Sequence, residues 1–554
     1  MGTLGSYVLG NAGPRFQPHE PLKVIANKVG PFKNPSETYE YYSLPFCSKQ
    51  KKKRHEDFGE TLVGDRRIAS PYEVTFLDQV PWRLLCDQVF SHEELKVFTK
   101  AIENDYYFEM FILDLPMWGY VGEVEGEDVL LGPLDAARRY IYPHLHFSIG
   151  YNQDQVVSVN VSTNPQRKVD ITDEFDGTEV TFSYSVDWVP RPDLAWSDRM
   201  SRYHDSRFLP GTFEIHWLSI INSFVLVLLL TAFLTIIMMR VLKNDFSRYM
   251  EVEEDELGEE ETGWKLINGD VFRFPPMANF LTACVGAGSH LFCVTFLLLS
   301  CAVAGFFVPT KRGAILTAMI VIYAMTAPVG GFVSGRLFRQ LGGDAWLANA
   351  LLSVLVFPAP LAFVFSWINS VALAHGSSAA LPATAIAGII ALFALVAFPL
   401  GLAGALVGRH TASDFKAPCR TTRVPREIPD DAPWYRAPPA QMFMAGFLPF
   451  SAIYIELHYI FASVWGHKIY TLFGILFLAF VMLVVVTAFI TVSLIYFQLA
   501  REDYRWWWRS MLCGGSTGAF IYVSSSSFFF WKYYETFFRP TPSSTSSTAP
   551  PWTA

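Results

Sequence analysis

The chain has 554 residues, of which 51% are hydrophobic, 16% are aromatic and only 17% are charged. Soluble proteins carry about a quarter of their residues as charged ones, so this composition excludes an ordinary soluble protein and predicts a membrane protein with at least two domains. The formal net charge of -8 lies largely in one segment, EVEEDELGEEE at 251–261. The chain shows no basic patch, and we expect no nucleic-acid partner.

Residues 1–212 are ordinary in polarity and are expected to form an all-β, sandwich-like domain. Short runs of alternating polarity predict its half-buried strands: YEVTFL at 72–77, HLHFSIGY at 144–151, QVVSVNVST at 155–163 and EVTFSYSVDWV at 179–189. One helix is predicted over 91–105, because Ser91 and Glu94 have the spacing of a capping box.

Cysteines and one sequon suggest covalent features of this domain. Cys47 and Cys86 are its only cysteines. In an oxidising compartment two such residues favour a disulfide, and two buried thiols are the alternative. Asn160 opens the sequence NVS and is a candidate for N-glycosylation.

The rest of the chain is a series of long apolar runs. A helix needs about 20 apolar residues to cross the hydrocarbon core, and eight runs qualify: 217–242, 278–308, 314–336, 346–374, 380–408, 441–464, 469–499 and 511–531. We therefore assign 213–242 to a first transmembrane helix, 243–277 to an acidic loop and 278–531 to a seven-span helical domain. Residues 532–554 are rich in Pro, Ser and Thr and are expected to be disordered.

The distribution of Lys and Arg between the loops predicts the orientation. One side collects 16 of them, within 240–273, 336–339, 409–436 and 501–509, and the other side collects five, within 311–312, at 468 and within 532–539. The first side is therefore predicted to be cytosolic and residues 1–212 to be lumenal. A lumenal domain of this size normally follows a signal peptide. We expect a missing leader, with a reversed signal anchor in the first span as the alternative.

Two ionisable residues lie in the apolar run FLPFSAIYIELHYIFASVWG at 447–466, namely Glu456 and His458. At 100° per residue they point to different faces of a helix, so they are not expected to form a pair. Glu456 is expected to face the bundle interior and to be either protonated or hydrogen-bonded to a polar group on a neighbouring span such as Asn349, Asn369 or Ser334. One interpretation is a polar clasp between helices, and the other is a site for a proton, an ion or a lipid headgroup.

Small residues recur four apart in two spans. Ala327, Gly331 and Gly335 form one series, and Gly404 and Gly408 form another. In lipid this spacing lets helix backbones approach closely. The series therefore indicates either packing within the bundle or a face that recognises the spans of other membrane proteins.

The sequence contains no HExxH, GxSxG or phosphate-binding glycine motif. We therefore expect no enzyme activity, catalytic residue, metal ligand or cofactor. The acidic run at 251–261 is interpreted as a solvated linker, and a binding segment for cytosolic trafficking adaptors is the alternative.

Several long blocks resemble the transmembrane-nine superfamily, the nonaspanins. They include GDRRIASPYEVTF at 64–76, GWKLINGDVFRFP at 263–275, YAMTAPVGGFVSGRLF at 323–338, FLPFSAIYIELHYIFASVWGHKIYTLFG at 447–474 and FQLAREDYRWWWRS at 497–510. The resemblance implies a lumenal β-sandwich followed by nine spans. The present chain shows eight, and we expect that it lacks the family's signal peptide and last span.

The resemblance also implies a function. Such proteins reside in Golgi and endosomal membranes and aid the trafficking of other membrane proteins, so the expected partners are membrane lipids, transmembrane client proteins and trafficking adaptors. A transporter or channel for a small solute, ion or lipid is the alternative. A lumenal adhesion or carbohydrate receptor is a third reading, which depends on the β-sandwich alone.

Overall fold

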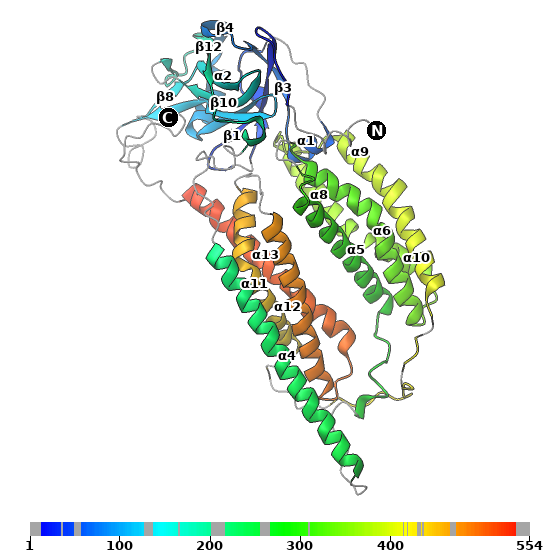
Figure 1. Ribbon diagram of the computed structural model, residues 1–554. Helices are drawn as coiled ribbons and strands as arrows, with labels where there is room; N and C mark the ends of the chain where they lie inside the picture. The colour runs from blue at the N-terminus through cyan, green and yellow to red at the C-terminus, as the bar shows by residue number, and fades with distance from the viewer. Residues whose placement is uncertain are drawn as a thin grey trace.

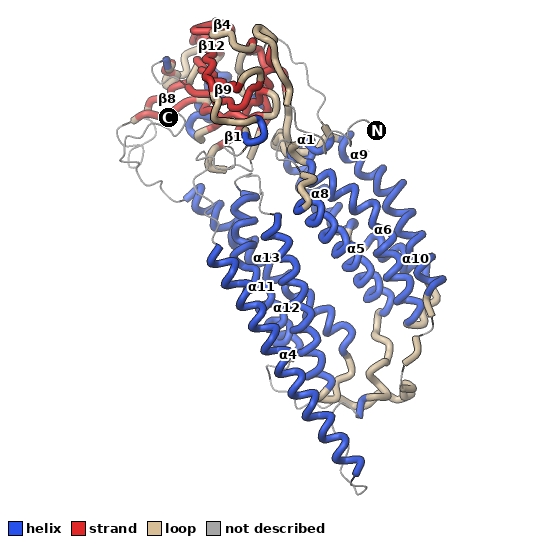
Figure 2. The backbone as a smooth tube through the Cα atoms, in the orientation of Figure 1, coloured by secondary structure: helices blue, strands red, loops and turns tan. Residues whose placement is uncertain are grey.

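The computed structural model describes residues 13–34, 37–48, 57–126, 137–163, 167–200, 217–254, 266–307, 311–413, 415–417, 419–428, 434, 437–465 and 473–538. The acidic run from 255 onward and the tail from 539 onward lie outside the described residues. A β-sheet domain stands at one end of a set of long helices (Figures 1 and 2).

The β-sheet domain contains three sheets. The first has the order β2-β1-β5-β6 with β3 also paired to β1, the second is β10-β9-β12-β4, and the third is β11-β8-β7. The strands are β1 (Pro21–Pro31), β2 (Tyr39–Glu40), β3 (Ile68–Thr75), β4 (Val80–Phe90), β5 (Tyr106–Ile112), β6 (Leu115–Tyr120), β7 (Gly122–Glu125), β8 (Arg138–Ile141), β9 (His144–Asn152), β10 (Gln155–Thr163), β11 (Val169–Asp170) and β12 (Thr178–Pro190). The four strands predicted from alternation correspond to β3, β9, β10 and β12.

Aromatic side chains join the first two sheets into one core. The ring of Tyr72 on β3 lies 5.2 Å from that of Phe147 on β9 and 5.4 Å from that of Tyr184 on β12. Edge-to-face contacts of this kind add to the burial of apolar area. The helices of the domain are α1 (Phe58–Val63) and α2 (His92–Glu103), and α2 begins with the predicted Ser91–Glu94 capping box.

The remaining helices are long and apolar, and seven spans in the described chain are long enough to cross a membrane. They are built from α4 (Trp217–Glu254), α5 (Ala278–Val303), α6 (Ala314–Gln340), α7 (Trp346–Leu355) with α8 (Pro358–Ala374), α9 (Ala383–Leu392) with α10 (Phe398–Thr411), α11 (Pro438–Trp465) and α12 (Phe473–Leu499). The eighth predicted span falls on α13 (Trp506–Phe538), which packs beside α11 and α12.

Element boundaries differ from the sequence prediction in four places. The first helix continues to Glu254, so the start of the predicted loop is helical, and α13 continues to Phe538, into the predicted tail. The fourth span breaks between α7 and α8, directly before Pro358. The fifth contains a π-helical turn at Phe393–Ala397, shortly before Pro399. Proline explains the break at Pro358, since it cannot donate the helical hydrogen bond.

The helices form two groups (Figure 1). One contains α5 to α10 and the other contains α4, α11, α12 and α13, and the two meet where α5 contacts α12. Phe292 packs against Phe480 at 5.5 Å and Phe296 against Phe477 at 6.0 Å between ring centroids. The β-sheet domain lies at the same end of both helix groups (Figure 1), and its contacts show to which of them it is attached.

Three consecutive tryptophans fix the segment before α5 at the far end of the helices. The indole N–H groups of Trp506, Trp507 and Trp508 donate to the carbonyls of Val271, Arg273 and Pro276 at 2.8, 3.1 and 2.8 Å. These side chains therefore join α13 to the other helix group, in addition to any contact with lipid.

Candidate functional site

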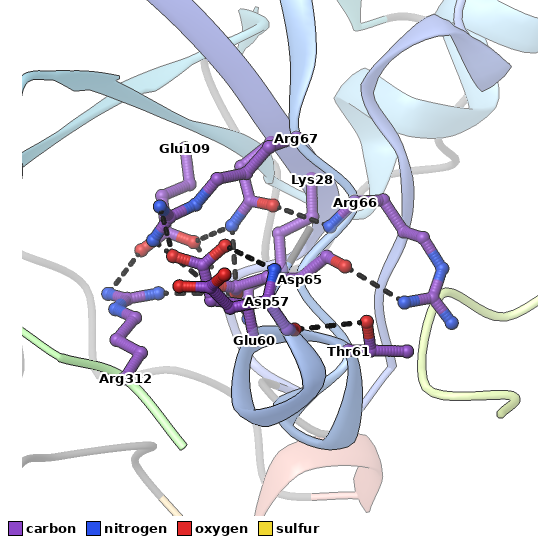
Figure 3. Close-up of polar contacts among 10 residues, drawn as sticks. Lys28, Asp57, Glu60, Thr61, Asp65, Arg66, Arg67, Glu109 and Arg312 are labelled. Carbon is purple, nitrogen blue, oxygen red and sulfur yellow. Dashed lines mark hydrogen bonds and ion pairs between the residues drawn. The ribbon is translucent and has the colours of Figure 1, made fainter. Parts of the chain in front are cut away.

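A buried polar cluster lies where the β-sheet domain meets the helices, and we call it the docking cluster (Figure 3). Its members are Asn27, Lys28, Glu60, Asp65, Arg67, Glu109 and Arg312. Three cations and three anions balance one another. Asn27, Lys28, Asp65, Arg67 and Glu109 are each less than a tenth exposed.

A β-bulge brings two neighbouring residues of β1 to the same acids. The register between β1 and β5 shifts between Ala26 and Lys28, and Lys28 lies opposite Glu109. A bulge sets two residues against one on the partner strand. Asn27 Nδ2 accordingly donates to Glu109 Oε2 at 2.8 Å and to Asp65 Oδ1 at 3.0 Å. Lys28 Nζ lies 3.8 and 3.6 Å from these same two oxygens.

Helix α1 positions Asp65. A capping box of Asp57 and Glu60 starts the helix, and Gly64 ends it with φ of 82°. Glycine adopts this left-handed conformation without the steric cost that a Cβ would bring. The turn sets Asp65 and Arg67 directly after α1, where Arg67 lies 2.5 Å from Glu60 Oε1 and 3.5 Å from Asp65 Oδ2.

Arg312 completes the cluster from the membrane domain. It lies two residues before α6, and its Nη2 is 2.7 Å from Glu109 Oε1 while its Nη1 is 3.4 Å from Asp65 Oδ1. Its guanidinium stacks on the ring of Phe111 at 4.9 Å. Gly313 follows with φ of 72°, and a Cβ at that position would overlap the backbone of Gly59. Arg312 therefore ties two acids of the β-sheet domain to the start of a membrane helix.

Backbone contacts beside the cluster fix the same two parts to one another. Arg66 Nη2 donates to the carbonyl of Ala380 at 2.5 Å. The amide of Ser378 donates to Thr38 O at 2.8 Å, and the hydroxyls of these two residues lie 2.6 Å apart. The β-sheet domain is thus attached to the loop between α8 and α9 as well as to α6.

The electrostatics of the cluster favour the ionised form of Glu109. Burial alone would raise the pKa of Glu109. The charges of Arg312 and Lys28, together with hydrogen bonds from Arg312 and Asn27, outweigh that effect and lower the pKa from 4.5 to about 2. Asp65 and Glu109 also hold the pKa of Arg312 above its ordinary value, against the effect of burial. Such an arrangement can hold two domains together, but it presents no free nucleophile.

The described residues contain no group of three or more His, Cys, Asp or Glu side chains placed to hold a metal ion. Sequence reasoning did not identify the docking cluster. Asp65, Arg66 and Arg67 lie in one of the resembling blocks, and Arg312 was counted only as a loop cation. Arg312 is separated from Glu109 by 203 residues of sequence and from Asp65 by 247, and local patterns carry no signal for such a pairing.

Glu456 lies on the buried face of α11 and is only 3% exposed. Neither of its carboxylate oxygens has a hydrogen-bond partner among the described residues. His458 lies elsewhere on the helix, with its ring 5.2 Å from Phe528 of α13. The two residues are therefore separate, as the helical spacing predicts.

The partners expected for Glu456 belong to other contacts. Asn349 accepts from the Ser334 hydroxyl at 2.8 Å and donates to Thr282 at 2.8 Å, within the α5 to α10 group. Asn369 accepts from the amide of Leu381 at 2.7 Å. The expected bond from Glu456 to one of these residues is thus wrong, because they pack in the other helix group.

The small-residue series pack against each other. Gly331 and Gly335 on α6 face Gly401 and Ala405 on α10, and Gly404 and Gly408 face Pro328 and Phe332 on α6. A Cβ at any of the four glycines of the series would overlap backbone of the opposite helix. Ala327 is also buried. This geometry is that of close helix packing, and these positions lie inside the α6–α10 contact.

The covalent candidates of the β-sheet domain lie as follows. Cys47 and Cys86 form a disulfide, with their Cα atoms 6.2 Å apart. It connects the segment after β2 to β4. Asn160 lies on β10, opposite Ser148 of β9, and is half-buried.

The described chain has seven apolar spans, and buried ion pairs attach the β-sheet domain to the start of one of them. These features define a multi-pass membrane protein with a large extramembrane domain. The family model described as Endomembrane protein 70 matches residues 38–537. The chain belongs to this family, the transmembrane 9 superfamily.

Relatives support this assignment over most of the chain. Transmembrane 9 superfamily members 4 and 2 of Arabidopsis thaliana are 48% and 47% identical to it, and member 1 of Bos taurus is 43% identical. Each alignment covers 89% of this chain and 82% of the relative. A comparison with solved structures finds no match.

Proposed function

We propose that this protein is a non-enzymatic factor of Golgi and endosomal membranes that aids the trafficking and membrane localisation of other transmembrane proteins. The observation that carries the proposal is the fixed attachment of the β-sheet domain to α6 and the α8–α9 loop. A client with spans and an extramembrane domain would meet both parts in one orientation. The family description, Endomembrane protein 70, supports the location.

In this proposal the β-sheet domain faces the lumen, and the far end of the helices faces the cytosol. The basic asymmetry of 16 to five supports that orientation. The partners are membrane lipids and transmembrane clients, and cytosolic adaptors would meet the far end.

The test is depletion of the protein followed by quantitative proteomics of the cell surface. Loss of a defined set of transmembrane proteins, restored by the wild-type chain, supports the proposal. The variant Arg312→Gln should restore them less well, because it loosens the attachment. Arg83→Gln, which removes only an exposed ion pair with Glu73, should restore them fully. An unchanged surface proteome after depletion contradicts a trafficking role.

A transporter or channel for a small solute, ion or lipid is the second candidate, and the unpaired carboxyl of Glu456 favours it. The space lined by His290, Tyr323, Ser353 and Phe393 has room for only about one water molecule. Solute flux into vesicles containing the purified protein would support this candidate. Inert vesicles combined with client loss in cells would support trafficking.

A further inference from the structure

Unpaired buried polar groups in the membrane-spanning helices gather on one side of the molecule. Among the described residues, Glu456, Gln498 and Thr517 are buried, Thr487 is half-buried, and each has a buried side-chain N or O atom without a hydrogen-bond partner. All four lie on α11, α12 and α13. No described buried side chain of α5 to α10 shares this property.

An apolar buried core shares a face of α11 with Glu456. This face also carries Ala445, Ala452 and Ile453, which belong to that core. The other members of that core are Val227 of α4, Ala479, Met482, Val486 and Ile490 of α12, and Cys513 of α13. A carboxylate in such a place would forgo its hydration without gaining hydrogen bonds.

Charged groups on the neighbouring helices lie near their ends. Helix α12 contains no Asp, Glu, Lys, Arg or His. On α13, Arg509 near the first turn bonds Gln441 and Asp503, and Lys532 is near the last turn. The described charged side chains of α4 are Arg240, Lys243 and Asp245, and Asp245 accepts a hydrogen bond from Tyr496 of α12. On α11 itself, His458 packs on Phe528.

The four unpaired groups occupy successive levels of the bundle. Gln498 is next to the last residue of α12, at the far end from the β-sheet domain. Thr487 lies eleven residues earlier on α12, beside Gly514 of α13, and Thr517 lies one turn further along α13. Gly446 of α11 packs on Ser516, so Glu456 lies about 15 Å of helix beyond that level.

We propose that Glu456 is a proton-binding site of the membrane domain. The carboxylic acid holds a proton at neutral pH and exchanges it with water from the far end, along a route marked by Gln498, Thr487 and Thr517. Ordered water satisfies buried polar groups that lack protein partners, and ionisable residues within membrane spans mark proton pathways. The ligand is the proton, and the exchange is an acid dissociation with water as the acceptor.

The first test is infrared spectroscopy of the full chain in lipid vesicles. At pH 7 the wild type should show a protonated-carboxyl C=O band that is absent from Glu456→Gln and that shifts when the buffer is changed to D2O. A spectrum identical to that of Glu456→Gln overturns the proposal, because the acid is then ionised. A band that stays unshifted in D2O also overturns it, because the proton is then sealed in.

A second measurement needs no variant. A hydrophobic carbodiimide reacts with protonated carboxyls in apolar surroundings, so it should modify Glu456 of the wild type in vesicles at pH 7 and leave the ionised Glu109 unmodified. Mass spectrometry of the digest reports both peptides. Lack of an adduct on Glu456 contradicts a protonated acid, even if Glu456→Gln fails to fold.

The route has its own test. The double variant Thr487→Val, Thr517→Val keeps side-chain shape but removes both hydroxyls. We expect the D2O shift of the Glu456 band to slow roughly tenfold, the effect of raising a barrier by about one hydrogen bond. The matched control is Thr326→Val on α6, whose hydroxyl only bonds the carbonyl of Ile322 and which should leave the rate unchanged. An unchanged rate in the double variant overturns the route.

Discussion

Arg312 contributes to domain attachment through charge and through geometry. Its guanidinium lies within 3.4 Å of two buried acids from different elements and stacks on Phe111. A lysine offers only a point charge and would not reproduce both contacts. Removal of one partner of a buried ion pair leaves the other charge without compensation, which is more costly than the loss of an exposed pair.

The variant Arg312→Gln should therefore destabilise the attached state by roughly 3–5 kcal/mol. The expected result is a lower unfolding temperature of the purified protein and faster protease cleavage between the two parts. Arg83→Gln is the control and should change stability by less than about 0.5 kcal/mol. Equal melting temperatures for the two variants would show that Arg312 does not hold the domains together.

The docking cluster should resist mild acid. The pKa of Glu109 is lowered from 4.5 to about 2 in the folded protein, so the unfolded state binds more protons between these values. The contribution of Glu109 to the stability of the folded protein is complete above pH 4.5 and is lost as the pH falls toward about 2. Denaturant titrations from pH 7 to 3 should show this loss only below pH 4.5, and Glu109→Gln should flatten that part of the curve. A Glu109-dependent loss at pH 6 would contradict the assignment.

His144 should make the β-sheet domain sensitive to a higher pH range. Burial, and then the charges of Arg167 and His146, lower its pKa from 6.5 to about 4. Its ring nitrogens lie 2.8 and 3.0 Å from the hydroxyls of Ser183 and Ser185. As the pH falls, His144 takes up a proton in the unfolded state before it does so in the folded state. The free energy of unfolding therefore falls as the pH drops from 6.5 to 4.

That loss should amount to on the order of 3 kcal/mol. The measurement is the free energy of unfolding as a function of pH for the wild type and for His144→Gln, whose slope between pH 6.5 and 4 should be smaller. His92→Gln, at an exposed position, is the control and should keep the wild-type slope. Parallel curves for His144→Gln and the wild type would refute the prediction.

At the scale of elements, the contact between α6 and α10 depends on the absence of side chains. A Cβ at Gly335 would overlap the backbone of Ala405, whereas a Cβ at Gly388 on α9 has no atom within 4 Å. Gly335→Val should therefore destabilise the membrane domain by roughly 1–3 kcal/mol or more through overpacking. Gly388→Val should be tolerated. Thermal unfolding in detergent compares the two, and similar melting temperatures would contradict the close approach.

Regular elements could be predicted from the sequence, but their partners could not. Alternation located β9, β10 and β12, and the apolar runs located the spans, because these signals are local. The sequence contains no comparable local signal for the bulge at Asn27 or for the π-helical turn at Phe393–Ala397. The break in the fourth span lies directly before Pro358, a residue whose effect on a helix is local and can be read from the sequence. Glu456 was recognised as buried, but its supposed partners were assigned without knowing that the helices form two groups.

At the scale of the whole molecule, the structure separates two sets of loops. The β-sheet domain, Arg312 and the α8–α9 loop lie at one end, and the segment before α5 and the tryptophans of α13 lie at the other. Figure 1 shows this separation along the helices.

In the proposed orientation, protease added to sealed microsomes should spare the β-sheet domain and cut the acidic segment at 251–261. Addition of detergent should then expose the domain, with the Cys47–Cys86 disulfide holding fragments together until reduction. Antibodies against both parts report the outcome. Cleavage of the domain in intact vesicles, with the acidic segment protected, would require the opposite orientation.

The β-sheet domain is continuous in sequence with α4, yet its docking contacts are with α6 and the α8–α9 loop of the other helix group. The domain is therefore attached by side-chain and backbone contacts to one helix group, while the next described element along the chain, α4, belongs to the other group. A tilt of α5 to α10 against α4 and α11 to α13 would strain both the phenylalanine contacts between α5 and α12 and the tryptophan contacts of α13. Because its docking contacts are with α6 and the α8–α9 loop, the β-sheet domain would move with the first of these groups.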